Sequence, residues 1–288
     1  MRGGVCVRSC LLVLAILVGV TGCASWQEAA VVLEDMAAGD GPSTLKQKTA
    51  PPIRQTIRYA VEGREYIADI HRPTHGAKAS IILVPGLVPQ GKNDPRLVAM
   101  ARTLARADFR VLVPELPGIR SLSVHRGHVE SIRDAMIHAR RSGALPAEAP
   151  LGLMAFSYAA GPAFLAALEP GEAKKVDFIL AVGGYHDLEA VLQYFTTGYY
   201  QAGDRWRYQP PRPAAKWSFV LANLDRIESP ADRSLLRSIA LRRMTDPDAV
   251  IHHLAGQLGP GGGAVYRLVT NDDPAATPTL INELPAPI

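Results

Sequence analysis

A serine flanked by small residues, Ser157, lies where an expected buried strand meets an expected helix. The preceding residues 151–156 are continuously apolar, which is typical of a strand buried on both faces, and residues 158–168 are mostly small and apolar. A strand that turns sharply into a helix lifts a serine hydroxyl clear of the sheet and points the helix N-terminus at it. The pattern predicts a serine nucleophile, with the backbone N–H of Tyr158 stabilising an oxyanion. The alternative is a core hydroxyl hydrogen-bonded within an apolar segment.

A serine nucleophile needs a base to accept its proton and a carboxylate to orient that base. Of the eight histidines only His186, His252 and His253 follow the serine. His186 follows an expected strand, at the edge of the sheet where ligands bind. The other two are neighbours on an expected helix, so their side chains diverge by about 100° and at most one faces a site. We therefore take His186 or His253 as the candidate base, with solvated or capping roles as the alternative.

Two positions are candidates for the carboxylate. Asp187 follows the expected strand 176–182, although an aspartate there is also an ordinary helix N-cap. Asp272 lies with Asp273 and Pro274 after the apolar run 264–270. That run is either a strand whose turn carries the acid or a helix followed by an element that Asp273 caps, and the sequence slightly favours the helical alternative.

The elements around Ser157 alternate between strands and helices. A hairpin around Glu62–Arg64 comes first, and strands then alternate with amphipathic helices, of which one begins at Asp94 and Pro95. This order predicts an α/β fold with a mostly parallel, doubly wound sheet. The expected strands are Thr56–Val61, Tyr66–His71, Ser80–Val84, Arg110–Val113, Leu151–Phe156 and Val176–Val182.

The segment Ala155–Ala159 resembles the nucleophile elbow of the α/β-hydrolase superfamily, with alanines at the positions of the usual glycines. The segment Pro85-Gly86-Leu87 resembles the turn that follows the third strand in that family, although Pro85 replaces the common histidine. The resemblance implies that Leu87 supplies a second oxyanion N–H and that the chain hydrolyses an ester or a related acyl substrate. It covers about residues 53–190.

The C-terminal part departs from the family pattern. Helices expected over 187–195, 229–244 and 246–258 suggest a helical cap, and Gly259–Gly263 suggests a flexible connection. No histidine follows Asp273, and the chain beyond Leu258 is too short for the roughly 60 residues of two further strand–helix units. We therefore expect incomplete C-terminal strands. The alternative to an enzyme is a truncated, catalytically inactive lipoprotein with a binding or scaffold role.

The N-terminal residues have the pattern of a secretory signal. Arg2 and Arg8 precede the apolar run 11–20, and the segment Val20-Thr21-Gly22-Cys23 resembles the bacterial lipobox. The resemblance implies that Cys23 becomes the new N-terminus and is acylated with chains such as palmitate. The expected location is the bacterial cell envelope, on the periplasmic face of a membrane. The predicted divisions are a signal peptide (1–22), a lipid-anchored tether (23–52), a hydrolase-like core (53–186), and a helical cap with a truncated C-terminal part (187–288).

The composition and the net charge limit which classes of partner the chain is expected to bind. The 288 residues are 48% hydrophobic and 20% charged, which is typical of a globular chain. Removal of Arg2 and Arg8 leaves 29 basic against 27 acidic residues, a net charge of +2 that provides no basic footprint for nucleic acid. The cysteines are Cys6, Cys10 and Cys23, so none remains for a thiol nucleophile or a zinc knuckle. We expect no cofactor and no metal; the expected partners are the bilayer and a small acyl or ester substrate.

Overall fold

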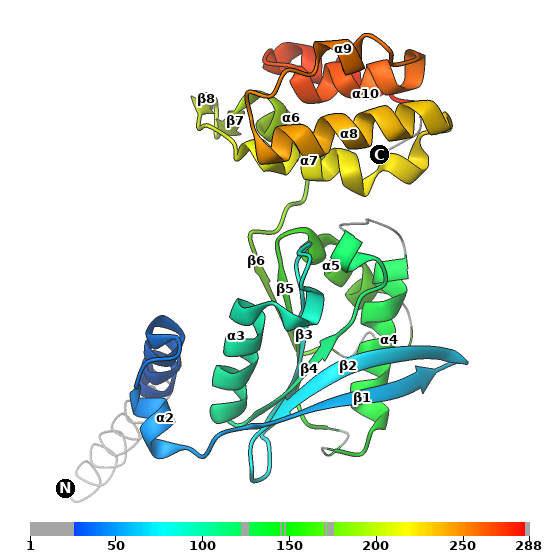
Figure 1. Cartoon of the computed structure of the whole chain (residues 1–288). Coiled ribbons are helices and arrows are strands. Elements are labelled where there is room, and N and C mark those ends of the chain that lie inside the picture. Colours follow the sequence, from blue (N-terminus) through cyan, green and yellow to red (C-terminus); the bar gives the residue numbers. More distant parts are fainter. Residues whose placement is uncertain are drawn as a thin grey trace, which may run out of the picture.

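The central element is a six-stranded sheet in the order β1-β2-β4-β3-β5-β6 (Figure 1). The computed structural model describes residues 26–285 except 122–126, 145, 147, 170 and 172–175. Strand β2 pairs antiparallel with β1 and β4, while β3 is parallel to β4 and β5, and β5 is parallel to β6. The expected mostly parallel α/β sheet is thus confirmed. Its strands are β1 (Ile53–Val61), β2 (Arg64–Arg72), β3 (Ala79–Val84), β4 (Phe109–Pro114), β5 (Leu151–Phe156) and β6 (Phe178–Val182).

The first two strands form the expected hairpin. Glu62 and Gly63 both have positive φ, +50° and +81°, which matches the tight turn that joins twisted antiparallel strands. The central strand β3 is buried along its whole length, as its continuous apolar run predicts.

Helices cover both faces of the sheet, as a doubly wound fold requires. Helix α3 (Pro95–Arg106) begins where the Asp94 carboxylate accepts a hydrogen bond from the Arg96 N–H, and its face with Leu97 and Ala101 packs on β3 and β4. Helices α4 (Gly127–Arg141) and α5 (Ala160–Leu168) bury their apolar side chains against the opposite face.

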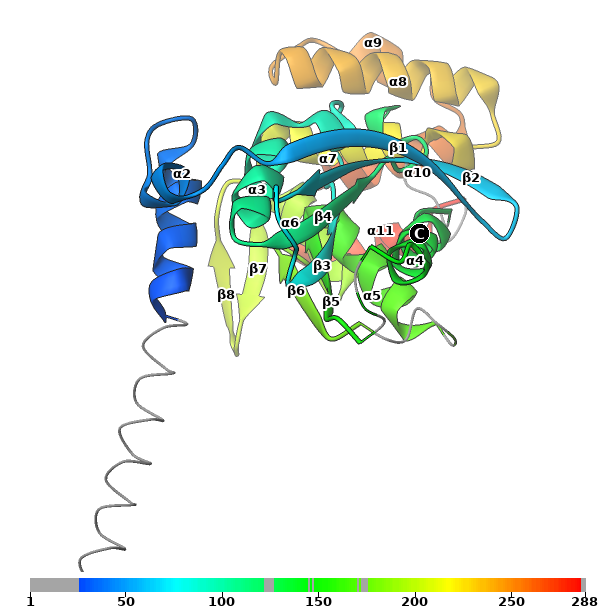
Figure 2. The same ribbon diagram turned by 90° about the horizontal axis from the view of Figure 1, so that it is seen from below.

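The described part of the segment expected to be a tether forms two helices. A helix over residues 26–38 and α2 (Thr44–Lys48) lie beside α3 (Figure 2). The carboxylate of Asp35 is buried and accepts hydrogen bonds from Ser43 and, in α3, Thr103. Residues 35–49 are therefore docked on the core, because burying that carboxylate requires these partners. Cys23 and the signal peptide lie outside the described residues, and none of the helices in the described part is long and apolar enough to span a bilayer.

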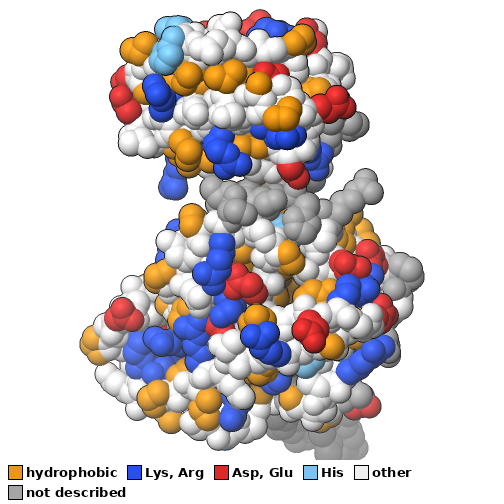
Figure 3. Space-filling model, turned by 45° about the vertical axis from the view of Figure 1, so that its right-hand side comes forward, with side chains coloured by type: hydrophobic (Ala, Val, Ile, Leu, Met, Phe, Trp, Pro, Cys, Tyr) orange, Lys and Arg blue, Asp and Glu red, His pale blue; other side chains and the backbone are white. Residues whose placement is uncertain are grey.

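Residues beyond β6 form a second lobe, the helical cap, which Figures 1 and 3 show above the carboxyl edge of the sheet. The cap has its own core, in which Trp217, Leu236, Ile239 and Leu224 are buried. Its elements are α6 (Leu188–Thr197), β7 (Tyr199–Ala202), β8 (Arg205–Tyr208), α7 (Pro213–Ala222), α8 (Pro230–Thr245), α9 (His252–Ala255), α10 (Pro260–Thr270) and α11 (Thr277–Asn282).

Two expectations for the cap are corrected and one is confirmed. The helix expected over 246–258 is reduced to α9, and Pro247 marks the end of α8, because proline disfavours helical conformation at the residue before it. The run 264–270 belongs to helix α10 and not to a strand, which confirms the favoured helical alternative. Gly259–Gly263 is not a flexible connection: the Asp232 carboxylate of α8 accepts hydrogen bonds from the N–H groups of Gly259 (2.8 Å) and Gly262 (2.9 Å) at the start of α10.

Strand β6 is an edge of the sheet in the part of the chain that the structure describes. Phe178, Leu180 and Val182 point to the face that carries α3, and they are 42%, 46% and 46% exposed. On the opposite face, Phe164 and Leu168 of α5 are also exposed. The β6 edge is therefore flanked by apolar surface.

Candidate functional site

Ser157 occupies a strained corner between β5 and α5. It has φ +51° and is one of three non-glycine residues with positive φ in the described part of the chain. A short 3-10 turn, η3 (Ser157–Ala159), links the strand to the helix. Ala155 and Ala159 are fully buried on either side, while Ser157 itself is exposed. The corner thus presents the hydroxyl at the surface of the core and not inside it, as the elbow pattern predicts.

The loop after β3 passes close to this corner. A Cβ added to Gly86 would lie 3.2 Å from the Phe156 carbonyl oxygen and 3.7 Å from the Ser157 Cβ. Only a residue without a side chain fits this approach without displacing its neighbours. Because Gly86 has no side chain, the loop can approach the corner closely, and Leu87 and Ser157 line the same pocket.

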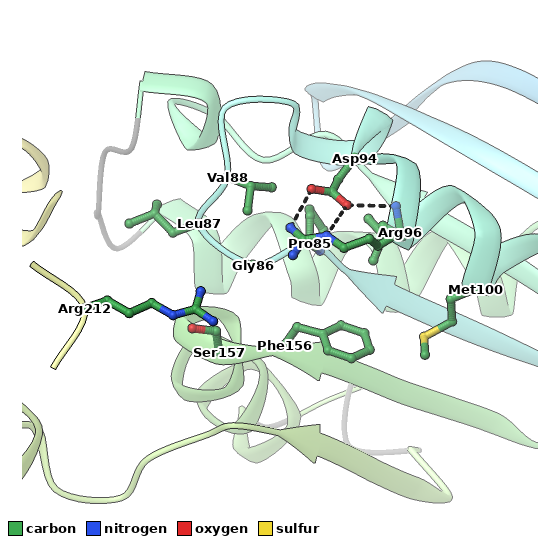
Figure 4. A pocket seen from close by; sticks show the side chains of 11 residues that line it. Pro85, Gly86, Leu87, Val88, Asp94, Arg96, Met100, Phe156, Ser157 and Arg212 are labelled. Carbon is green, nitrogen blue, oxygen red and sulfur yellow. Dashed lines mark hydrogen bonds and ion pairs between the residues drawn. The ribbon is translucent and has the colours of Figure 1, made fainter. Parts of the chain in front are cut away.

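A cavity of about 520 Å³ opens beside Ser157 (Figure 4). Its wall is apolar along α3 and the end of β5, and charged side chains lie at its margins. Figure 4 shows the guanidinium of Arg212, from the cap, beside the Ser157 hydroxyl, with Phe156 and Met100 on the other side. The lining residues are Pro85, Gly86, Leu87, Val88, Asp94, Arg96, Leu97, Met100, Phe156, Ser157 and Arg212.

Asp94 is the carboxylate on this wall, and it is held by Arg96. The Arg96 guanidinium donates from Nε to Oδ1 (3.0 Å) and from Nη2 to Oδ2 (2.8 Å). These bonds, with the backbone N–H of Arg96, hold the pKa of Asp94 below its usual range despite its burial. Asp94 is thus an anion that caps α3 and neutralises Arg96.

The expected bases do not line the pocket. His186 is exposed in the segment between β6 and α6, and His252 and His253 are exposed on α9. Both expected acids also lie off its wall. Asp187 caps α6, where it accepts a hydrogen bond from the Ala190 N–H at 3.1 Å, and Asp272 is exposed after α10. The structure therefore brings Ser157, Leu87 and Tyr158 together without the histidine or the acid.

A buried histidine, His128, is hydrogen-bonded to the side chain of Tyr158, the residue after Ser157, and the sequence did not predict this contact. His128, at the start of α4, lies 2.6 Å by Nε2 from the Pro117 carbonyl oxygen and 3.0 Å by Nδ1 from the Tyr158 hydroxyl. Because a carbonyl only accepts, the neutral ring carries its proton on Nε2, and Nδ1 accepts from Tyr158. Burial raises the pKa of Tyr158. Thirty residues separate this pair, and no spacing rule signals such a contact.

The described residues contain no cluster of three or more histidine, cysteine, aspartate or glutamate side chains that could hold a metal ion. No group in the pocket forms a metal-ligand set, and we assign no cofactor to it.

Comparison with known proteins gives distant similarities. No family model matches the chain, and no curated protein matches it. Among solved structures, a dienelactone hydrolase from Anabaena variabilis shares 15% identity over 46% of this chain and 63% of that one, with a TM-score of 0.36. Brefeldin A esterase, a bacterial homologue of human hormone sensitive lipase, shares 16% identity over 52% of this chain and 45% of that one, with a TM-score of 0.37. Candida antarctica lipase A shares 11% identity over 84% of this chain and 62% of that one, with a TM-score of 0.42.

These three proteins are named as a hydrolase, an esterase and a lipase. This chain matches less than two thirds of the length of each of them. At this identity and with TM-scores below 0.5, the similarities do not by themselves assign an activity.

Proposed function

We propose that this chain is a serine hydrolase that cleaves an ester or a related acyl compound at Ser157. The observation that supports this most is the positive φ of Ser157 at an exposed strand-to-helix corner that opens on a cavity. A non-glycine residue in the left-handed region costs about 1 kcal/mol or more, and such strain concentrates at functional sites.

In this mechanism the Ser157 oxygen attacks the carbonyl carbon of the substrate. The backbone N–H groups of Leu87 and Tyr158 stabilise the oxyanion that forms. The alcohol leaves with a proton, and water then hydrolyses the acyl-enzyme to regenerate the hydroxyl. Apolar side chains of Leu97, Met100 and Phe156 exclude water from one side of the cavity.

We assign the proton-accepting role to His186. It follows the carboxyl end of β6, and β6 pairs with β5, whose own carboxyl end carries Ser157. The imidazole is exposed and is not among the described residues that line the cavity, so in this proposal it reaches Ser157 when substrate binds. Asp187 or Asp272 is the partner acid in this proposal, and His253 is the competing base.

A fluorophosphonate probe tests the nucleophile. We expect covalent labelling of the folded chain, loss of labelling in Ser157→Ala, and full labelling in Ser142→Ala, whose hydroxyl lies outside the pocket at the end of α4. Absence of labelling in the folded wild type contradicts the proposal. For the base, His186→Ala should abolish ester turnover, while His253→Ala should retain it; the opposite result transfers the role to His253.

One observation favours a second candidate, a catalytically inactive binding or scaffold protein. Among the described residues that line the cavity there is no histidine, and the one carboxylate, that of Asp94, is neutralised by Arg96. This candidate predicts that wild type and Ser157→Ala hydrolyse no ester and still bind the same ligand. Ester turnover that Ser157→Ala loses refutes it.

We further propose that acylated Cys23 tethers the chain to a membrane of the bacterial cell envelope, on its periplasmic face. The support is the lipobox resemblance after a short apolar run. Two acyl chains hold a protein on a bilayer, whereas one does so only marginally. Mass spectrometry of the N-terminal peptide should find Cys23 acylated and residues 1–22 absent, and Cys23→Ser should release the chain from membranes. A free Cys23 thiol on the wild-type chain contradicts this proposal.

A further inference from the structure

Two guanidinium groups line the cavity beside Ser157, and their charges differ in how they are compensated. Arg96 is neutralised by two hydrogen bonds to the carboxylate of Asp94. The Arg212 guanidinium makes no ion pair or hydrogen bond within the part of the chain that the structure describes, and it is directed at the Ser157 hydroxyl (Figure 4). The cavity thus holds one uncompensated positive charge beside the expected reacting atom.

The backbone around Arg212 is stiff, which fixes where its side chain begins. Arg212 is the N-cap of α7 and stands between Pro211 and Pro213, with an extended conformation (φ −65°, ψ 122°). The chain before it is anchored by a hydrogen bond of 2.9 Å from the Gln209 N–H to the Gly198 carbonyl. Because so few backbone conformations are available, the point from which the Arg212 side chain extends toward the cavity is restricted before any ligand binds.

The two sides of the cavity differ in chemistry. One side is formed by Leu97, Met100 and Phe156 together with the paired charges of Asp94 and Arg96, while the unpaired Arg212 lies on the other side of Ser157. A guanidinium matches a carboxylate with two parallel hydrogen bonds, and a charge-assisted bond is about twice as strong as a neutral one.

We propose that Arg212 is a specificity residue that binds a carboxylate on the substrate, so that the substrate has an anionic group on one side of the scissile carbonyl and an apolar group on the other. Monoesters of short dicarboxylic acids have this arrangement. The inference rests on the proposed function only in placing the carboxylate next to the scissile bond. Binding of the carboxylate by Arg212 itself requires no reaction at Ser157.

Two esters of equal length test the preference: 4-nitrophenyl hydrogen glutarate, which carries the carboxylate, and 4-nitrophenyl pentanoate, which carries a methyl group there. We expect wild type to have the higher kcat/KM for the glutarate ester, mainly through a lower KM. Arg212→Gln should lower the ratio of the two kcat/KM values by about tenfold or more. Arg207→Gln, which removes a charge from the same lobe on exposed β8, should keep the ratio. An unchanged ratio in Arg212→Gln overturns the inference.

Binding measured without turnover separates this inference from the proposed function. Calorimetry on Ser157→Ala should show tighter binding of monomethyl glutarate, which keeps one carboxylate, than of methyl pentanoate, which has none, and the double variant with Arg212→Gln should lose that difference. If wild type hydrolyses neither ester but the binding difference is present, the hydrolase proposal fails and the inference stands. If the 4-nitrophenyl esters are hydrolysed and Ser157→Ala binds the two methyl esters equally, the inference fails and the hydrolase proposal stands. Circular dichroism of each variant checks that the helices are intact, and Arg212→Lys should retain part of the preference.

Discussion

Gly86 and Ser157 come from loops 71 residues apart in the sequence, yet a Cβ on Gly86 would lie 3.7 Å from the Cβ of Ser157. The glycine therefore fixes how closely the loop after β3 approaches the corner after β5. The proposed oxyanion donors, Leu87 and Tyr158, each follow one of these two residues, so their separation depends on that approach.

Substitution of Gly86 by alanine should slow catalysis without unfolding the chain. The new Cβ would meet the Phe156 carbonyl oxygen at 3.2 Å, so the loop must move by a few tenths of an ångström. Complete loss of one oxyanion donor costs about 100-fold or more in kcat, and a small displacement should cost about tenfold. Steady-state kinetics with a 4-nitrophenyl ester measures kcat. The matched control is Gly76→Ala, where nothing lies within 4 Å of the new methyl group. Equal kcat values for the two variants would contradict the role of Gly86.

Because His71 is buried, we expect the folded chain to lose stability on mild acidification. The side chain is 1% exposed, and neither ring nitrogen has a hydrogen-bond partner in the described structure. Burial, with the charge of Arg54, lowers the pKa of His71 to about 4. An unfolded histidine has a pKa of about 6.5, so the unfolded chain binds the proton first as pH falls. The free energy of unfolding is therefore unaffected by protonation of His71 above about pH 6.5. It falls progressively down to about pH 4, by about 3 kcal/mol.

Denaturant unfolding at pH 7 and pH 4.5 measures this effect. Wild type should lose free energy of unfolding between these two values, and His71→Leu should lose less. His75→Gln removes an exposed imidazole and serves as the control for the loss of a histidine as such. An identical slope in wild type and His71→Leu would show that other groups carry the pH dependence.

Asp232→Ala should destabilise the helical cap. The carboxylate is 3% exposed and accepts hydrogen bonds from the N–H groups of Gly259 and Gly262, at the start of α10. Its removal leaves two backbone donors without this partner, at a cost of about 2–3 kcal/mol. Thermal unfolding followed by circular dichroism should show a lower Tm than Asp204→Ala, which removes an exposed carboxylate from the same lobe. Equal Tm values would mean that water replaces the carboxylate at these glycines.

A charge on the β6 edge should reduce self-association. Leu180 is central in an edge strand and is 46% exposed between Phe178 and Val182, and apolar edge strands pair readily with other chains. Leu180→Lys should lower light scattering at high protein concentration relative to wild type. Leu241→Lys, at a residue that is 50% exposed on α8, controls for the added charge alone. Equal effects of the two substitutions would argue against association through the strand edge.

The sheet and the serine corner were predictable from sequence because their signals are local. Buried parallel strands are continuous apolar runs, and the elbow needs only small residues at fixed distances from Ser157. The run 264–270 was ambiguous because a short apolar run fits a strand or a buried helix. What decides it is Pro260 at the first turn of α10 and the Asp232 carboxylate, which lies 27 residues or more away in sequence.

Other features of the site could not be predicted because they depend on packing between distant segments. The position of Arg212 beside Ser157 follows from how the cap sits on the core, and no sequence pattern near Arg212 signals it. The docking of residues 35–49 depends on Asp35 reaching Thr103, a contact 68 residues apart. The same holds for His128 and Tyr158.

The cavity is bounded by two hydrophobic cores, because Ser157 belongs to the sheet and Arg212 to the lobe built around Trp217 and Ile239. The chain passes once from one to the other, through the short segment between β6 and α6. Local melting of the second core removes the guanidinium while the serine corner stays folded. Heat or a core substitution such as Ile239→Ala should then produce a chain that still accepts an acyl group but no longer distinguishes acids from hydrocarbons.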